Sequence, residues 1–288
     1  MSGGATKEIE TYRLAARPMA LGDIEALHAL SIGVRWPHRP EDWAMLIRAG
    51  HGVVAEDEIG RVVGCAMWWP LGEGLVSVGM VITTPRLQEQ GAARWLMAQI
   101  EPEIAGQDRV LSATRAAYRL YLSLGFRPGA TVWQHQGIVV EAPAPVPGAR
   151  AMEPGDGEAV RMLDAQALGA SRRAVMDELL AISEGTVIER DGRVVGFALC
   201  RPFGRGHVVG PVVAEREADA VALVAPHVAA RAGRFLRLDT REEEGPLRSY
   251  LTAAGMLFYD TVTSMAAGRE RPATGPGRTF ALASQALG

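Results

Sequence analysis

Residues 76–96 read VSVGMVITTPRLQEQGAARWL, and the rest of the chain is organised around this stretch. Its first half, up to Thr83, is an apolar and β-branched run that is too short for a helix and is closed by Pro85, which predicts a buried strand. Its second half begins a helix. Gly91 and the two alanines after it leave the backbone bare where the first helix amides lack partners. Such a turn favours a phosphate or pyrophosphate, because the amides and the helix dipole both attract anions.

The pattern Gln88-x-x-Gly91-x-Ala93 after a strand and a proline resembles the acetyl-CoA-binding motif of the GNAT acetyltransferase superfamily. The resemblance implies acetyl-CoA as cosubstrate. It also implies cofactor contacts from the strand and from the turn with its helix start, namely Val81, Ile82, Thr83, Gln88, Glu89, Gln90, Gly91, Ala92, Ala93 and Arg94.

A second segment strengthens this resemblance. Residues 117–126, with Tyr121 and a Leu-Gly-Phe corner, are similar to a later helix of the family that carries a tyrosine beside the CoA sulfur. The resemblance implies that Tyr121 contacts the cofactor and acts as general acid, since a phenol with a pKa of about 10 can protonate a departing thiolate. The structural alternative is a half-buried aromatic side chain that packs a core with Ala117 and Leu124.

For the oxyanion donors and for the general base, the sequence offers candidate residues without deciding among them. In the family, the strand that corresponds to Val81–Thr83 splays from its neighbour, so that its amides become candidate oxyanion donors; the alternative is ordinary pairing in a sheet. An amine must lose a proton before it attacks, and Glu41, Asp42, Glu73 and His38 are candidate bases or surface groups, none of them singled out. Trp36 and Trp43 belong to the loop and helix that usually wall the acceptor site, although core packing also explains the tryptophans.

Composition excludes several classes of protein. A length of 288 residues suits two domains, and 48% hydrophobic with 22% charged residues is typical of a globular chain. The formal net charge of −3 provides no basic face for nucleic acid. We expect no membrane span and no export signal, and therefore a cytoplasmic protein. Cys65 and Cys200 lie in apolar runs and are predicted to be buried free thiols. His28 and His51 have no metal-ligand spacing, so we expect no metal.

The sequence repeats itself. Arg17 to Leu27 returns as Arg150 to Val160, and Gly60-Arg-Val-Val-Gly64 returns as Gly192-Arg-Val-Val-Gly196. Gly79 corresponds to Gly210, and Gly125 to Gly255, which indicates duplication. We therefore predict an N-terminal GNAT domain with the acetyl-CoA site in residues 9–142, a Pro-rich linker in 143–148 and a degenerate GNAT-like domain in 149–288. The predicted fold class is α/β with α+β character, in which a central mixed sheet is flanked by helices in each domain.

The second copy is predicted to have lost the cofactor site. A constant offset of 131 places Asp219 opposite Gln88 and Ala222 opposite Gly91, and an offset of 130 places Leu251 opposite Tyr121. The apolar end of the chain, Thr279 to Leu287, is predicted to be a buried final strand of this lobe. In the first copy, a helix after Asp23 is predicted to direct Leu27, Leu30 and Ile32 inward, and the helix of the cofactor site is predicted to begin near Gln90.

These inferences predict an N-acetyltransferase that moves an acetyl group from acetyl-CoA to an amine of a small molecule or peptide by direct attack. The alternative is a non-catalytic acyl-CoA-binding sensor or regulatory protein. We expect a monomer or homodimer, and no nucleic-acid or membrane partner.

Overall fold

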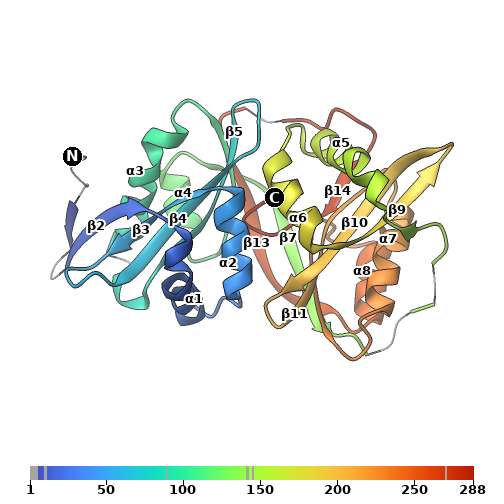
Figure 1. Ribbon diagram of the computed structural model, residues 1–288, viewed down its shortest axis with the longest axis horizontal. Coiled ribbons are helices and arrows are strands. Elements are labelled where there is room, and N and C mark those ends of the chain that lie inside the picture. Colours follow the sequence, from blue (N-terminus) through green and yellow to red (C-terminus); the bar gives the residue numbers. More distant parts are fainter. Residues whose placement is uncertain (1–5, 10–11, 89, 141–142, 145, 270) are drawn as a thin grey trace.

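The computed structural model describes residues 6–9, 12–88, 90–140, 143–144, 146–269 and 271–288. Two lobes lie side by side (Figure 1). The first sequence repeat folds as β2 (Tyr12–Pro18), η1 (Leu21–Asp23), α1 (Ile24–Gly33), α2 (Pro40–Ala49), β3 (His51–Glu56), β4 (Val62–Pro70), β5 (Leu75–Thr83), η2 (Pro85–Leu87), α3 (Ala92–Ile104), β6 (Asp108–Ala113), α4 (Tyr118–Ser123) and β7 (Arg127–Ile138).

The second repeat follows nearly the same order, which confirms the duplication. It folds as β8 (Arg150–Ala151), η3 (Pro154–Asp156), α5 (Gly157–Leu168), α6 (Arg173–Ile182), β9 (Glu184–Arg190), β10 (Arg193–Phe203), β11 (Gly206–Ala214), α7 (Glu217–Ala229), β12 (Phe235–Thr240), α8 (Pro246–Ala253) and β13 (Leu257–Ala267). Outside the repeated unit lie β1 (Thr6–Ile9) and β14 (Arg278–Ala281).

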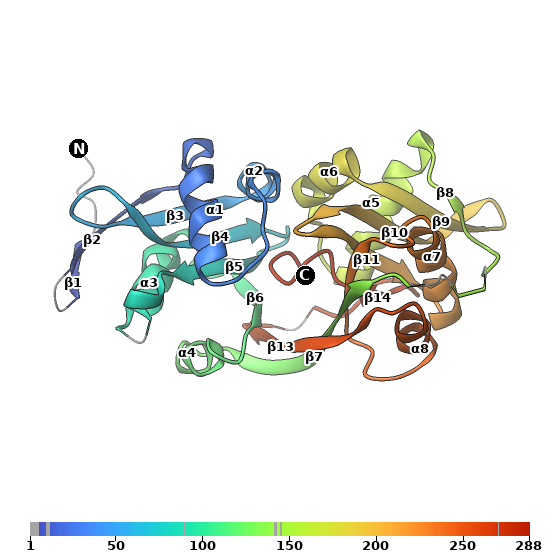
Figure 2. The same ribbon diagram turned by 90° about the horizontal axis from the view of Figure 1, so that it is seen from below.

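The two repeats exchange their last strands. The described strands form one fourteen-stranded sheet in the order β1-β2-β3-β4-β5-β6-β13-β7-β12-β14-β11-β10-β9-β8. Strand β13 of the second repeat thus lies between β6 and β7 of the first, and β7 lies between β13 and β12. Figure 2 shows β13 and β7 where they run together from one lobe to the other. Val132 on β7 stands opposite Val262 on β13 in the antiparallel register. Because each exchanged strand finds its hydrogen-bond partners in the other repeat, neither lobe has a complete sheet alone.

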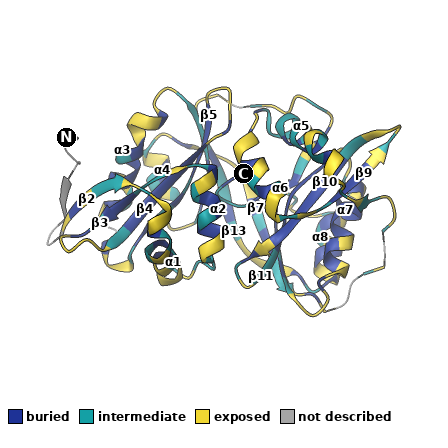
Figure 3. Ribbon diagram, viewed as in Figure 1, coloured by how far each residue is buried: buried dark blue, intermediate teal, exposed yellow. Residues whose placement is uncertain are grey.

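A shared apolar core joins the lobes as well. One cluster of buried side chains includes Leu27, Trp43 and Met80 from the first repeat together with Val175 and Leu199 from the second. Separate clusters lie under α3 and α4 in one lobe and under α7 and α8 in the other. Figure 3 shows the buried residues concentrated along the sheet and the helix faces that cover it. The two lobes therefore share an apolar interface.

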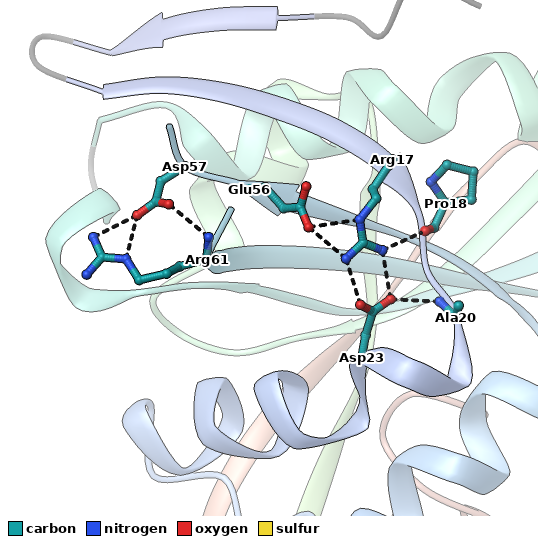
Figure 4. A network of polar contacts seen from close by, with 7 residues as sticks. All are labelled: Arg17, Pro18, Ala20, Asp23, Glu56, Asp57 and Arg61. Carbon is teal, nitrogen blue, oxygen red and sulfur yellow. Dashed lines mark hydrogen bonds and ion pairs between the residues drawn. The ribbon is translucent and has the colours of Figure 1, made fainter. Parts of the chain in front are cut away.

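An ion-pair network repeats at the start of each repeat and supports the alignment. Arg17 contacts Asp23 at 2.7 Å and Glu56 at 2.7 Å (Figure 4). In the second repeat Arg150 contacts Asp156 at 2.7 Å, and its other neighbour is Glu189 at 2.9 Å. Each aspartate also accepts a backbone N–H three residues before it, so the arginine fixes the turn that starts the first helix of the repeat.

Three local predictions were wrong. Ile32 is 53% exposed rather than inward, because Leu27, Leu30 and Ser31 form the buried face of α1 and Ile32 lies on another side of the helix. The end of the chain is buried and joins the sheet of the second lobe as predicted, but its strand covers only Arg278–Ala281 and the rest continues without regular structure. Helix α3 begins at Ala92, two residues later than predicted, because Gly91 adopts a left-handed conformation with φ 77°. Both cysteines are buried free thiols, as predicted.

Candidate active site

Strands β5 and β6 separate halfway along their length. They pair in parallel from Leu75, opposite Asp108, to Ser77, opposite Val110. Beyond this point β5 continues to Thr83 beside β4 alone, and its register with β4 shifts between Cys65 and Met67. Met80 takes φ 49° in the same segment, which is an unusual conformation for a residue with a side chain. The result is an opening between the strands, as the resemblance implied.

The predicted contact residues of β5 face different sides of this opening. Thr84 donates its N–H to the Val63 carbonyl at 2.9 Å, and Ile82 stands opposite Cys65. Because successive amides of a strand alternate in direction, the Ile82 amide is directed to β4 and the Thr83 amide to the open side. Val81 packs its half-buried side chain against the cluster under α3. The cofactor contacts of these residues stay predictions.

The predicted anion-binding turn and the start of α3 follow β5 along the chain. Gln88 ends η2 and is exposed, as are Gln90 and Gly91, whereas Glu89 lies outside the described residues. Gly91 is the N-cap of α3, and the first in-helix hydrogen bond runs from the Trp95 N–H to its carbonyl at 3.0 Å. The amides of Ala92, Ala93 and Arg94 precede this bond and belong to the anion-attracting end of the helix.

Tyr121 lies close to this helix start. It is 6% exposed and packs in one buried cluster with Leu87 and Ala92, with its ring edge-on to Phe126 at 5.7 Å. Burial raises the pKa of the Tyr121 phenol above its ordinary value, so it remains protonated at neutral pH. Arg94 donates to the Ser123 hydroxyl at 2.5 Å and thereby ties α4 to α3. Burial fits both the packing role and a proton donor shielded from water.

The corresponding opening in the second repeat is filled. Strands β11 and β12 pair only from His207 to Val208 before they separate. Strand β14 lies between them beyond that point, antiparallel to β11 at Val212 and to β12 at Thr240. The chain then continues past Gly210, where Leu282 lies against the backbone. The end of the chain therefore occupies the gap that stands open in the first repeat.

The second repeat also lacks the turn itself, which corrects the alignment at constant offset. Residues 84 to 91 connect β5 to α3, but only Glu215 and Arg216 connect β11 to α7. Asp219 does not replace Gln88; it lies in the first turn of α7 and pairs with Arg190 and with Arg216. The alignment of Leu251 with Tyr121 is correct, since both carbonyls accept the same corner bond, from Met256 and from Phe126.

A cavity of about 720 Å³ lies between the lobes and extends into the β5–β6 opening. Gly79 and Met80 line it from β5, and Ser112 and Thr114 line it from β6. The second repeat and the end of the chain form much of the remaining wall, with Arg201, Phe203, Gly204, Arg205, Val208, Arg237, Asp239, Tyr259, Asp260, Val262, Ser284, Gln285 and Ala286. Both repeats thus build one cavity.

Contacts between the lobes hold this cavity in shape. Gly204, in the β10–β11 hairpin, donates its N–H to Asp42 at 3.3 Å, and Arg39 donates to the Pro202 carbonyl at 3.1 Å. On the other side, the Ser77 hydroxyl donates to the Ala286 carbonyl at 2.7 Å. The hairpin and the end of the chain are therefore fixed against the first repeat.

Of the four candidate bases, His38 alone lines the cavity. Asp42 is buried and pairs with Arg39 at 2.9 Å, so it caps α2. Glu41 is exposed, and Glu73 lies 3.8 Å from Arg271 with a largely exposed side chain. Burial lowers the pKa of His38 to about 4, which keeps the imidazole neutral.

The tryptophans of the first repeat lie partly at the cavity and partly in the core. Trp36 lines the cavity, whereas Trp43 and Trp69 are fully buried core residues. The sequence reasoning missed Arg201 and Asp239, which reach the cavity from the second repeat. A signal existed for Arg201, because an arginine within the apolar run GFALCRPF is unexpected in a buried strand.

Neither metal ligands nor membrane-spanning helices emerge from the described part of the chain. Its His, Cys, Asp and Glu side chains form no group of three arranged to hold a metal ion. None of its helices combines the length and apolar character needed to cross a membrane.

Comparisons with known proteins agree with this architecture. Two family models, each described as acetyltransferase (GNAT) domain, match residues 48–128 and residues 160–281. A search of curated protein sequences gives no significant match.

Solved structures share the fold at low identity. A candidate acetyltransferase from Pyrococcus horikoshii has a TM-score of 0.79 at 16% identity, over 96% of both chains. A GCN5-related N-acetyltransferase from Sphaerobacter thermophilus has a TM-score of 0.62 at 20% identity, over 88% of this chain and 95% of its own. A tandem GNAT protein from the clavulanic acid biosynthesis pathway has a TM-score of 0.61 at 16% identity, over 89% of this chain and 99% of its own.

Proposed function

This chain belongs to the GNAT acetyltransferase superfamily as a tandem two-domain member, and from that premise we propose that it transfers the acetyl group of acetyl-CoA to an amine of a small molecule or peptide. The first repeat binds the acetyl-CoA, and the cavity between the lobes receives the amine.

The difference between the two strand openings carries this proposal. Beside β5, the opening is continuous with the cavity, and the chain leads on from β5 through a turn and Gly91 into α3. Beside β11, the equivalent opening is filled by β14, and no comparable turn precedes α7. One acyl donor site per chain follows from this asymmetry.

The residues of the first repeat suit each part of such a site. The amides at the start of α3 would hold the pyrophosphate, and the open side of β5, with Thr83, would hold the arm that carries the thioester. The amine nitrogen attacks the carbonyl carbon, the C–S bond breaks, and the CoA thiolate takes a proton from Tyr121. The acceptor attacks as the neutral amine, the nitrogen of the new amide loses its extra proton to solvent or to a group in the cavity, and the Tyr121 phenolate regains a proton from solvent.

A non-catalytic sensor of acyl-CoA is the second candidate. It would need only the turn and the helix start, whereas an acyltransferase also needs an acceptor cavity that reaches the thioester. The 720 Å³ cavity lies within the range of small-molecule sites, about 300–1,000 Å³. Its continuity with Gly79 and Met80 favours the enzyme.

An amine panel separates the two candidates. We would incubate the protein with acetyl-CoA and amino acids, polyamines, amino sugars, arylamines and short peptides, and measure release of the CoA thiol and the mass of the products. Transfer to any amine above the rate without protein supports the enzyme. Tight acetyl-CoA binding by calorimetry, with thiol release that no amine increases, would support the sensor instead.

A further inference from the structure

The cavity contains a buried cation without a carboxylate partner. Arg201 lines the cavity from β10 and is 1% exposed. Its Nη2 donates to the Ala283 carbonyl at 3.1 Å, while its Nε and Nη1 are buried and make no hydrogen bond. Among the described residues, no aspartate or glutamate lies within ion-pair distance of it. A buried guanidinium in this state is costly, because it has lost water and gained no anion in exchange.

Nearby charges relieve this cost only in part, since Asp42 favours the charged form of Arg201 whereas Arg237 and Arg39 oppose it. Arg237 and Arg201 lie over the same Phe203 ring, with guanidinium carbons 5.6 Å and 5.2 Å from its centroid. Arg237 is already paired with Asp239 at 2.6 Å, and the neighbouring Arg39 is paired with Asp42 at 2.9 Å. Of these three arginines, Arg201 is the one whose positive charge has no carboxylate partner among the described residues. Burial also lowers its pKa to about 10, which still leaves it protonated at neutral pH.

The fold itself does not require an arginine at this place. Arg201 stands opposite Val208, and in the first repeat Trp69 stands opposite Ser77 at the equivalent point of the β4–β5 hairpin. Each residue precedes a proline near the end of its strand. Trp69 is fully buried in the core, with its indole N–H bonded to the Leu46 carbonyl. The same position thus accepts a neutral aromatic side chain, so the cation has another purpose.

A second unpartnered group lies beside the first. His38 lines the same cavity, and its ring is edge-on to Phe203 at 5.3 Å. Its Nδ1 is buried and makes no hydrogen bond. Arg201 from the second repeat and His38 from the first therefore lie against one aromatic ring, and both have buried nitrogens without a hydrogen-bond partner.

We propose that Arg201, with His38 beside it, binds an anionic oxygen group of the acceptor, so that the substrate is an amine that also carries a carboxylate or a phosphate. This inference rests on the proposed function. The anion sits by Phe203 while the amine reaches Met80 at the opening of β5, since both residues line the same cavity. It also explains why the second repeat is retained without a cofactor site: it supplies the recognition group.

Matched pairs of acceptors test the proposal. The pairs are L-phenylalanine with 2-phenylethylamine, L-lysine with 1,5-diaminopentane, and glucosamine 6-phosphate with glucosamine, and the measured quantity is kcat/KM. We expect the anionic member of a pair to be preferred by about tenfold or more, as a charge-assisted hydrogen bond provides. Which pair shows the preference distinguishes carboxylate from phosphate.

Variants assign the preference to one residue. R201Q should lower kcat/KM for the anionic acceptor about tenfold and change that for its neutral partner less than about threefold, whereas R201K should restore part of the loss. R193Q, on the exposed start of the same strand, is the matched control and should leave both unchanged. Equal use of anionic and neutral amines by the wild type, or a preference that survives in folded R201Q, would overturn the proposal.

A binding measurement keeps the proposal independent of catalysis. Thermal melting is followed with N-acetyl-L-phenylalanine, N-acetylglucosamine 6-phosphate and inorganic phosphate as probes, for the wild type and R201Q. A rise in Tm with a probe that R201Q loses supports the anion site even where no amine is acetylated, in which case the proposed function fails and the site stands. No rise with any probe in a protein that acetylates amines without charge preference removes the site and leaves the proposed function intact.

Discussion

The carbonyl oxygen of Leu282 lies against Gly210 so closely that a β-carbon on this glycine would overlap it. Gly210 is the counterpart of Gly79, which borders the open side of β5. The end of the chain thus closes the second opening through backbone contact, so the two repeats differ at this place while they share a fold.

One CoA site per chain is the first expected outcome. Calorimetric titration should give one equivalent, and Gly91→Glu should abolish binding, because its bulk and charge would oppose the pyrophosphate. Gly91 has φ 77°, so any side chain also costs about 1 kcal/mol of strain. Gly106→Glu is the control, since Gly106 has φ 74° near the other end of α3 with open space around it. Two equivalent sites, or equal affinity in Gly91→Glu, would contradict the assignment.

Replacement of Tyr121 by Phe separates packing from proton transfer. The edge-on contact with Phe126 survives in Tyr121→Phe, so fold and CoA affinity should be kept. Transfer should slow about 100-fold, as expected when a general acid is lost. Tyr118→Phe, in the first turn of the same helix, is the control and should retain full activity. Equal turnover of Tyr121→Phe and wild type at several pH values would return Tyr121 to a packing role.

The first repeat alone, residues 1–142, should be poorly soluble, or should bind CoA without turning over its acceptor. Without β13, strand β6 has an exposed edge and β7 loses both neighbours in the sheet. The apolar cluster shared between the lobes would also be exposed. Soluble yield, CoA affinity and transfer rate are compared with the full chain. A soluble fragment with undiminished turnover would mean that the second repeat is dispensable.

Leu282→Ala should destabilise the whole chain by about 2–5 kcal/mol. Leu282 is 1% exposed and packs against Val132 and Val262, which belong to the two exchanged strands. The loss should appear as one cooperative shift in a denaturant titration, because the strands join both lobes. Leu257→Ala on β13 is the control, with a side chain that is 58% exposed and an expected change below about 0.5 kcal/mol. An unshifted midpoint for Leu282→Ala would show that the end of the chain is not part of the cooperative core.

The Arg17 guanidinium lowers the pKa of Asp23, so this pair should stabilise the fold only above acid pH. The unfolded carboxyl has a pKa of about 3.9, and the contribution is complete above that value and disappears as pH falls through the lower folded pKa. Asp23→Asn should cost about 1 kcal/mol at pH 7, since Arg17 is partly exposed, and progressively less as the pH falls below about 3.9. Asp177→Asn removes a surface ion pair and serves as control. A difference between wild type and Asp23→Asn that does not change with pH would contradict the linkage.

The sequence by itself determined the superfamily and the duplication, and it predicts the loss of the cofactor site from the second repeat. These depend on local patterns: a strand followed by proline, a glycine that must turn left-handed at the helix start, and the Leu-Gly-Phe corner that places Tyr121. Such features are encoded within a few neighbouring residues, and the structure contains each of them. The constant-offset alignment of Asp219 failed because a deletion in a connection leaves no local trace once apolar residues continue on both sides.

Only the tertiary structure decided how the repeats cooperate. The exchange of β7 and β13 depends on pairing between residues more than a hundred positions apart, and any apolar strand satisfies the local pattern equally well. Likewise, the apolar side chains of β14 predict that the strand is buried, but they do not show that it fills the gap between β11 and β12. In the sequence, Arg201 is only an unexpected charge within an apolar strand. Its place at the cavity between the lobes depends on long-range packing, which local patterns do not encode.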